Sequence, residues 1–235
     1  MEKKKVWIGG NHSVIAAINN KSRFIYEVVV LEKNSKLDNL KINYKIKNKK
    51  FFTKIFNKSH IAHQGIAVLA SIPEYPDINI IKNEIKNVVI LDNITDPMNI
   101  GTIIRNCVAF NIEAIIINER DFNDSSSSML KASSGAIEKI KICKVKNLMN
   151  AVRILKKENF WIIGLDSNSK QKFENHSWNL KNAFIFGSEG QGIKKILKEN
   201  CDYLLKININ NNIESLNVSS AVSASLAIFN LKNEN

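Results

Sequence analysis

The stretch that decides the class of fold is Val88-Val-Ile-Leu-Asp-Asn-Ile-Thr-Asp-Pro-Met-Asn-Ile-Gly-Thr-Ile-Ile-Arg105-Asn-Cys-Val-Ala-Phe-Asn-Ile-Glu-Ala-Ile-Ile-Ile117. Its apolar ends read as two buried strands, and its middle reads as a polar loop followed by a helix. Asp96 or Asn99 can cap that helix. Further apolar runs alternate with helical segments at residues 161–165, 183–186 and 203–207. We therefore predict an α/β fold with a mostly parallel sheet that helices cover on both faces.

A second stretch, Ala183-Phe-Ile-Phe-Gly-Ser-Glu-Gly-Gln-Gly-Ile193, runs from a strand into a glycine-rich turn. Its glycines allow the backbone to approach a ligand closely. Their order is G-x-x-G-x-G, and they lie late in the chain, so the turn does not match the G-x-G-x-x-G of dinucleotide sites. Nor does it match a P-loop.

A third stretch, residues 207–229, reads as a strand end, a polar loop and a helix of unusually small residues. The turn Glu214-Ser215-Leu216-Asn217 is the predicted N-cap, because serine and asparagine side chains accept the free N–H groups of a first helical turn. A helix with so many serines and alanines can be packed closely by another backbone.

Together the three stretches carry the spacing Asn99-x-Gly101-x-x-x-Arg105, then Phe186-Gly-Ser-Glu-Gly-Gln-Gly-Ile193, then Ser215-Leu-Asn-Val218. This set resembles the SpoU (TrmH) family of RNA ribose 2′-O-methyltransferases over roughly residues 88–229. Lys131-Ala-Ser-Ser-Gly-Ala136 is similar to the A-S-x-G-A element of that family. One departure is Ile207-Asn208-Ile209, where the family usually has Ile-Pro-Met; losing the proline frees a φ angle and restores an N–H.

The resemblance implies S-adenosylmethionine as cofactor, held through backbone groups of Gly187, Ile207 and Leu216. It marks Arg105 as the key catalytic residue, with Asn99, Glu189, Ser215 and Asn217 around it. Arginine is permanently charged and a poor base, so we expect Arg105 to bind a phosphate and to stabilise the developing alkoxide. Glu189 either orients Arg105 or a loop amide, or is purely structural. Without this context, Arg105 reads as a solvated helix residue.

The N-terminal part, residues 1–71, is predicted to be a small α/β unit with helices at 12–20 and 49–56 and strands at 26–31 and 65–70. Gly9-Gly-Asn-His-Ser-Val14 and His63-Gln-Gly-Ile66 resemble signatures of the RNA-binding domain in the branch acting on 23S ribosomal RNA, a domain like ribosomal protein L30e. His63 either supports a turn or touches RNA. Phe51, Phe52, Ile55 and Phe56 form a stripe that favours core over a base-stacking platform.

The organisation that follows is an RNA-binding domain at 1–71, a linker at 72–86 with two prolines, and a methyltransferase domain at 87–235. The resemblance also implies a trefoil knot, in which the chain after about Ile207 threads the loop of roughly 187–206, and a homodimer. Connection rules alone do not predict a knot.

Composition agrees with an RNA partner. Lys and Arg number 34 against 22 Asp and Glu, a formal net charge of +12, which attracts polyanions. Cys107, Cys143 and Cys201 are far apart and form no metal-binding pattern, so we expect reduced thiols, no metal and a cytoplasmic protein. We find no signal sequence and no apolar run of the roughly 18 residues that a membrane span needs.

The expected function is methyl transfer to the ribose 2′-hydroxyl of a guanosine in 23S ribosomal RNA. One alternative is the same chemistry on transfer RNA. Another is a non-catalytic RNA-binding protein with a degenerate methyltransferase fold, which the Asn208 departure keeps open. The glycine order disfavours a nicotinamide-dependent oxidoreductase.

Overall fold

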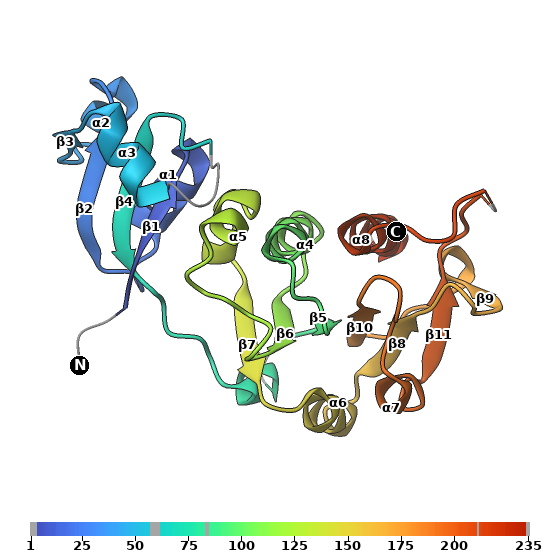
Figure 1. Ribbon diagram of the computed structural model, residues 1–235. Coiled ribbons are helices and arrows are strands. Elements are labelled where there is room, and N and C mark those ends of the chain that lie inside the picture. The colour runs from blue at the N-terminus through green and yellow to red at the C-terminus, as the bar shows by residue number, and fades with distance from the viewer. Residues whose placement is uncertain (1–3, 57–61, 83–84, 211, 234–235) are drawn as a thin grey trace. The chain divides into compact units, whose positions relative to one another are not determined.

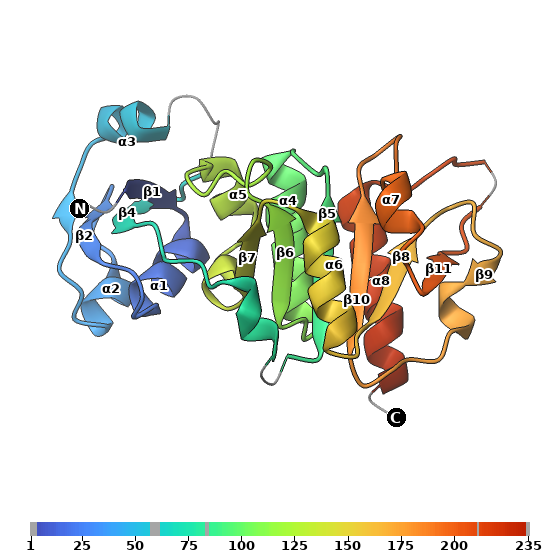
Figure 2. The same cartoon turned by 90° about the horizontal axis from the view of Figure 1, so that it is seen from below.

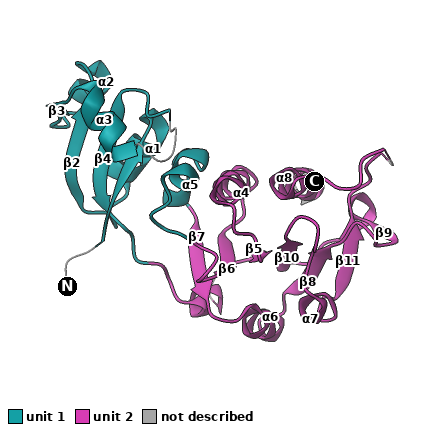
Figure 3. Cartoon of the chain, viewed as in Figure 1, with its two compact units in different colours: residues 1–74, 123–139 teal, residues 75–122, 140–235 magenta. Residues whose placement is uncertain are grey.

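The computed structural model describes residues 4–56, 62–82, 85–210 and 212–233. The chain forms two compact units (Figure 3). Unit 1 comprises residues 1–74 and 123–139, and unit 2 comprises residues 75–122 and 140–235. The first break falls near the predicted end of the N-terminal domain, but the segment 123–139 joins unit 1 although it lies far along the chain.

Unit 1 contains a four-stranded sheet in the order β1-β4-β2-β3. Strands β1 and β2 run antiparallel to β4, and the short edge strand β3 runs parallel to β2. The strands are β1 Lys5–Gly9, β2 Ile25–Val30, β3 Lys45–Ile46 and β4 Ile66–Ser71. The helices are α1 Asn11–Asn19, α2 Ser35–Asn39, α3 Lys49–Phe56, α5 Ser127–Ala132 and the 3₁₀ helix η2 Ala136–Glu138. The two predicted helices and two predicted strands are confirmed to within a residue, while strand β1 was not predicted.

Half of the predicted stripe of α3 is core: Phe52 and Phe56 are buried, whereas Phe51 and Ile55 are only partly buried and pack against that core. Phe52 and Phe56 pack with Val29 of β2 and Ala67 of β4. Phe52 and Phe56 are four residues apart, so their side chains lie on one face of α3, and this face is buried against the sheet.

The returning segment 123–139 packs on α1 and β1 of unit 1. Gly135 has a φ of 85°, and a Cβ placed there would lie 2.7 Å from the Ala16 Cβ and 3.0 Å from the His12 carbonyl oxygen. The A-S-x-G-A element therefore contains a glycine that lets this segment pack closely on α1.

Unit 2 is a seven-stranded sheet in the order β7-β6-β5-β10-β8-β11-β9, with its described neighbouring strands parallel (Figure 2). Its strands are β5 Asn87–Asp92, β6 Ala114–Asn118, β7 Lys141–Val145, β8 Trp161–Leu165, β9 Gln171–Lys172, β10 Asn182–Gly187 and β11 Tyr203–Lys206. Its helices are α4 Pro97–Ala109, α6 Leu148–Lys157, α7 Lys195–Lys198, α8 Val218–Asn233 and the 3₁₀ helices η1 Ile78–Lys82 and η3 Phe173–Asn175. Helices α4 and α8 lie on one face and α6 and α7 on the other (Figure 1). The predicted α/β architecture is confirmed.

The range 72–86, predicted as a linker, contributes to the core of unit 2. Ile81 and Ile85 are buried in one cluster with strand residues Val88 and Ile90. The prolines at 73 and 76 do break regular structure there, but the apolar residues that follow them are packed rather than exposed.

The three cysteines are free thiols, as predicted. Burial raises the pKa of Cys143 to about 11 and that of Cys201 to about 12, and it raises the pKa of the buried Cys107 still further. All three thiols are therefore protonated and unreactive near neutral pH. In the part of the chain that the structure describes, no helix is both long and apolar enough to cross a membrane.

Candidate active site

The site lies where β5 and β10 end, side by side in the middle of the unit 2 sheet. Gly187, the last residue of β10, is in register with Asp92, the last residue of β5. The glycine turn follows β10, and the loop that leads into α4 follows β5. The carboxyl ends of parallel strands are the usual place for ligands in such folds.

Each motif residue is positioned by a local feature of its own element. Asp96 caps α4, because its carboxylate accepts hydrogen bonds from the N–H groups of Met98 and Asn99, each at 3.2 Å. Pro97 occupies the first turn, where its missing N–H costs nothing. The cap holds Asn99 in the first turn of the helix.

The three predicted motifs meet in a group of hydrogen bonds. The Asn217 Nδ2 donates to the Asn99 Oδ1 at 3.1 Å and to the Glu189 Oε1 at 2.6 Å. The same Glu189 oxygen accepts the N–H of Val218 at 3.3 Å. Glu189 thus binds the first turn of α8 through Asn217 and Val218.

Asn217 also caps α8. Its Oδ1 accepts the N–H of Ser219 at 2.9 Å and the Ser219 hydroxyl at 2.6 Å. Helix α8 in turn contacts α4, where the Asn106 Nδ2 donates to the Ser219 carbonyl oxygen at 3.1 Å. The predicted polar turn is therefore the cap, and Asn217 supplies it.

The glycine turn is held tightly at its base. A Cβ on Gly187 would lie 2.0 Å from the carbonyl carbon of Gly192, so no other residue fits there without moving the turn. The Gly192 N–H donates to the Ser188 carbonyl oxygen at 2.9 Å.

Asp92 closes this turn, and the sequence did not single it out. Its fully buried carboxylate accepts the Lys194 N–H at 2.8 Å through Oδ2, and its Oδ1 lies 3.3 Å from the Lys194 Nζ. A buried carboxylate is retained only with such partners. The sequence signal that could have identified it is its position as an acidic residue at the end of an otherwise apolar strand.

A cavity of about 540 Å³ opens between the loops at the carboxyl ends of β8, β10 and β11. The three predicted cofactor residues, Gly187, Ile207 and Leu216, all line it, as do Glu189 and Ser215. Asp166, Ser167 and Asn168, which follow β8, line it too and were not predicted.

Arg105 and Asn208 both face solvent. Arg105 is exposed on α4, six residues after Asn99, which is about 9 Å along a helix. Among the described residues, Arg105 is not part of the hydrogen-bonded group around Asn217. Asn208 is exposed, whereas its neighbours Ile207 and Ile209 line the cavity. The missing proline of the family pattern therefore alters an exposed residue that is not among those lining the cavity.

The described residues contain no group of three His, Cys, Asp or Glu side chains arranged to hold a metal ion.

Comparison with known proteins agrees with this geometry. Residues 86–227 match the model of a family described as the SpoU rRNA Methylase family. A protein of Staphylococcus aureus strain MSSA476, named for the TrmH family of tRNA/rRNA methyltransferases, is 31% identical over 228 residues, 92% of each chain. A Bacillus subtilis protein named for the same family is 34% identical over 165 residues, 68% of this chain and 66% of the relative.

Solved structures share the whole fold at lower identity. The SpoU methyltransferase AviRb from Streptomyces viridochromogenes, in complex with AdoMet, superposes with a TM-score of 0.82 at 17% identity, covering 98% of this chain and 91% of the other. An AdoMet-bound rRNA methyltransferase from Sinorhizobium meliloti gives a TM-score of 0.81 at 19% identity, covering 98% and 87%. The fold, the meeting of the three motifs and the family match lead to one conclusion: this chain belongs to the SpoU family of S-adenosylmethionine-dependent RNA methyltransferases.

Proposed function

We propose that this protein transfers a methyl group from S-adenosylmethionine to the ribose 2′-hydroxyl of a guanosine in 23S ribosomal RNA, in the cytoplasm. The observation that carries the proposal is the hydrogen-bonded group of Asn99, Glu189 and Asn217 beside a cavity lined by Gly187, Ile207 and Leu216. The choice of ribosomal RNA is supported by the sequence signatures of the N-terminal domain.

The residues around the cavity fit S-adenosylmethionine. The volume of about 540 Å³ lies in the range of small-molecule sites. Phe186, Leu205 and Ile207 offer apolar walls for an adenine ring, and Asp166 and Glu214 offer carboxylates for hydroxyl and ammonium groups. When bound, the cofactor supplies a methyl group that its sulfonium has already activated.

The protein's own residues then have to position and polarise the ribose hydroxyl. Arg105, exposed on α4, is available to bind a phosphate of the RNA and to stabilise negative charge at the 2′-oxygen. Asn99 and Asn217 hold each other in place and offer neutral hydrogen bonds, with Glu189 fixing Asn217. Ser215 lies at the cavity, exposed, where it can meet the substrate.

We also propose a trefoil knot for unit 2. Strand β11 lies on the far side of β8 from β10, yet α8, which follows it, packs on α4 and β10. The chain after Ile207 must therefore cross back over the strand ends, past the glycine turn to which Asn217 is bonded. A trefoil knot requires that the chain after β11 returns in this way and passes through the loop of roughly 187–206.

The protein is further proposed to be a homodimer with an N-terminal RNA-binding domain like ribosomal protein L30e. Helix α8 carries many small side chains, and Met98 at the start of α4 is 53% exposed. A second copy packing on these helices would bring its own surface close to Arg105. Sedimentation that finds an active monomer contradicts this part of the proposal.

Methylation of purified RNAs tests the main proposal. The protein is incubated with labelled S-adenosylmethionine and either 23S ribosomal RNA or transfer RNA, and the modified nucleotide is mapped. We expect a 2′-O-methylguanosine in 23S ribosomal RNA. Transfer RNA is the second candidate because the relatives are named for tRNA/rRNA methyltransferases. Label in transfer RNA alone contradicts the choice of substrate, and cofactor binding without transfer to either RNA contradicts the catalytic role.

A further inference from the structure

Helix α3 covers only part of one face of the unit 1 sheet. The covered part holds Val29 and Ala67 under Phe52 and Phe56. The same face continues two residues further along the strands. There, Leu69 of β4 lies in register with Trp7 of β1 and Glu27 of β2. All three are only partly buried among the described residues, so α3 does not cover this part of the face completely.

A β-bulge adds aromatic rings to this part of the face. The pairing of β2 with β4 shifts between Ile25 and Glu27, which leaves Tyr26 as an extra residue. Bulges re-aim a side chain and often occur near functional sites. Tyr26 is 37% exposed and Phe24 is 61% exposed, and their ring centroids lie 4.8 Å apart. Across the same face, the Trp7 ring meets Phe51 of α3 edge-on at 5.6 Å.

Lysines border these rings. The Lys5 Nζ lies 4.6 Å from the centre of the Tyr26 ring, and the Lys47 Nζ lies 5.3 Å from the centre of the Phe51 ring. Lys45 pairs with Glu27 at 3.2 Å, so the acidic group of the face is neutralised. Residues 41–54 contain six lysines and no Asp or Glu. Lys5 and Lys47 therefore place positive charge beside the rings, next to a lysine-rich segment of the chain.

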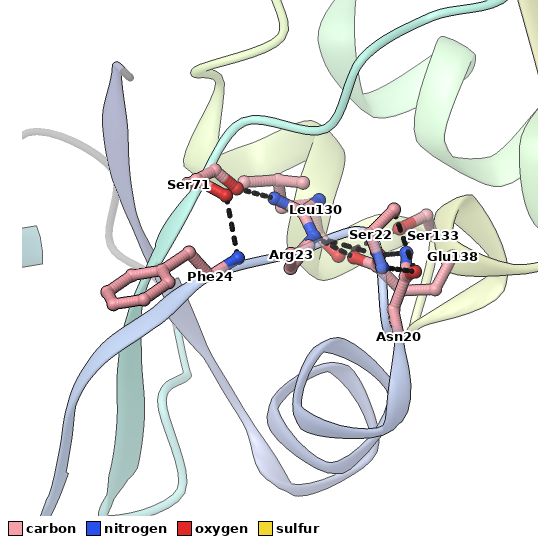
Figure 4. A network of polar contacts seen from close by, with 8 residues as sticks. All are labelled: Asn20, Ser22, Arg23, Phe24, Ser71, Leu130, Ser133 and Glu138. Carbon is pink, nitrogen blue, oxygen red and sulfur yellow. Dashed lines mark hydrogen bonds and ion pairs between the residues drawn. The ribbon is translucent and has the colours of Figure 1, made fainter. Parts of the chain in front are cut away.

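The backbone that presents Phe24 is rigidly anchored (Figure 4). The buried Arg23 donates to Glu138 at 2.8 Å and to the Ser71 carbonyl oxygen at 2.7 Å. The Ser71 hydroxyl accepts the Phe24 N–H at 2.9 Å. The Phe24 ring points away from this network. An aromatic ring held ready at the surface loses little conformational freedom when it binds a partner.

We propose that Trp7, Phe24, Tyr26 and Phe51, together called the aromatic face, stack the bases of single-stranded RNA while Lys5 and Lys47 bind its phosphates. Sheets that present aromatic rings stack unpaired bases in this way, and cations beside the rings follow the backbone. Duplex RNA does not fit, because its bases are already stacked inside the helix. A protein partner is disfavoured, because lysine is depleted in the cores of protein interfaces. The inference rests on the proposed function and adds where unpaired RNA is held.

The test uses the full-length protein and a fluorescent single-stranded RNA of mixed sequence, with a duplex of the same sequence beside it. Phe24→Ala combined with Tyr26→Ala should weaken single-strand binding by about tenfold or more, because each base stacked on an aromatic ring contributes substantially to affinity. Tyr26→Phe, which keeps the ring, should bind like the parent. Leu40→Ala is the matched control, since Leu40 is 50% exposed on unit 1 outside the aromatic face.

The lysines give a second, independent readout. Lys5→Ala combined with Lys47→Ala should reduce the dependence of affinity on salt, because phosphate contacts release counterions. The aromatic variant should leave that dependence unchanged. The matched control is Lys36→Ala, an exposed lysine of α2.

Three results would overturn the inference: unchanged single-strand affinity in a folded aromatic variant, an equal loss for duplex RNA, or a change in sedimentation that assigns the face to a second copy of the chain. Its failure is distinguishable from failure of the proposed function. With the substrate RNA saturating, the aromatic variant should methylate at the parental rate and show only a raised KM. A parent protein that binds single strands through the face but methylates no RNA refutes the proposed function and leaves this inference intact.

Discussion

Asn217 is the residue through which the three motifs are connected. One end of its amide donates to Asn99 and Glu189, and the other end caps α8. Only a side chain with both a donor and an acceptor can do this. An aspartate would cap the helix equally well but would place a second carboxylate against Glu189.

We therefore expect Asn217→Asp to lower the free energy of unfolding by about 1 kcal/mol, since a hydrogen bond is replaced by like-charge repulsion. The methylation rate should fall with it. Adding Glu189→Gln restores a donor opposite the new acceptor, so the double variant should recover most of the stability. Urea unfolding of both single variants and the double variant measures the coupling. Additive losses would show that the two side chains do not interact.

Arg105 differs from Asn217 because, in the part of the chain that the structure describes, its side chain is exposed and lies outside the hydrogen-bonded group. We expect Arg105→Ala to fold normally and to slow single-turnover methylation by on the order of 10²-fold or more, because charge stabilisation at the 2′-oxygen is lost. Cofactor affinity should barely change, since the cavity is lined by Gly187, Ile207 and Leu216. Arg105→Lys should also fail, because an ammonium lacks the two-pronged planar geometry. A near-parental methylation rate in Arg105→Ala would show that Arg105 is an ordinary solvated helix residue without a catalytic role.

Among the elements, the glycine turn after β10 offers a matched pair of variants. A Cβ at Gly187 meets backbone at 2.0 Å, whereas a Cβ at Gly190, with a φ of 83°, meets nothing within 4 Å. Gly187→Ala should displace the turn and weaken S-adenosylmethionine binding at least tenfold. Gly190→Ala should cost on the order of 1 kcal/mol of stability through backbone strain and leave binding nearly intact. Calorimetric titration compares the two, and equal losses would mean that strain rather than close packing governs the turn.

The turn at His63–Gly65 is the element that predicts a pH dependence. The His63 Nδ1 accepts the Gly65 N–H at 3.0 Å, and His63 stacks on Phe56, so the turn needs a neutral imidazole. Burial, and secondarily Lys131, lower the pKa of His63 below its ordinary value of 6.5. Burial lowers the pKa of His176 as well. His63 is therefore confirmed as a support of this turn.

Well above pH 6.5 both histidines are neutral in the folded and the unfolded chain, so their titration leaves stability constant there. As the pH falls below 6.5, the unfolded chain takes up protons first, and the free energy of unfolding should decrease. Urea unfolding at several pH values measures this slope. His63→Asn should show a shallower decrease than the parent. An identical slope would show that His63 does not contribute.

The whole molecule departs from a simple succession of domains, because residues 123–139 return to unit 1. Their anchor is the ion pair of Arg23 and Glu138, whose side chains are 1% and 4% exposed. Removing one member of a buried pair leaves the other charge unpaired and costs about 3–5 kcal/mol. Arg23→Ala should therefore destabilise unit 1 strongly.

The check is denaturant unfolding of Arg23→Ala, Glu138→Ala and the double variant. The double variant should recover part of the loss, because no lone charge stays buried. A surface pair offers the control: Lys156 with Asp202 is 39% and 34% exposed, so Lys156→Ala should cost about 1 kcal/mol or less. Similar losses at both pairs would contradict the distinction between buried and exposed pairs. The same result indicates how a truncated protein would behave. A fragment that lacks residues 1–74 contains Glu138 but not Arg23, so this ion pair cannot form in it.

Much of the protein could be predicted from local pattern. Strands β5, β6, β8 and β10 are mostly continuous apolar runs, and the start of α4 carries a proline and a capping aspartate, so neighbouring residues are enough to define them. The motifs likewise indicated Gly187, Ile207, Leu216, Glu189 and Ser215, which line the cavity, and the group that meets at Asn217, but they did not indicate Asp166, Ser167 and Asn168. Short strands with interspersed charges, such as β1 and β7, were not predicted, because their burial depends on partners elsewhere in the chain.

The remaining features arise from residues that are distant in sequence. Asp92 binds Lys194, Arg23 binds Glu138, and Tyr26 is displaced by the pairing of β2 with β4. No periodicity of nearby residues encodes such contacts, since each depends on which strands become neighbours and how closely their loops pack. The sequence alone therefore defined the motif residues and the local conformation of the main strands and helices. The closure of the glycine turn, the return of residues 123–139 and the aromatic face depend on tertiary packing between residues that are distant in sequence.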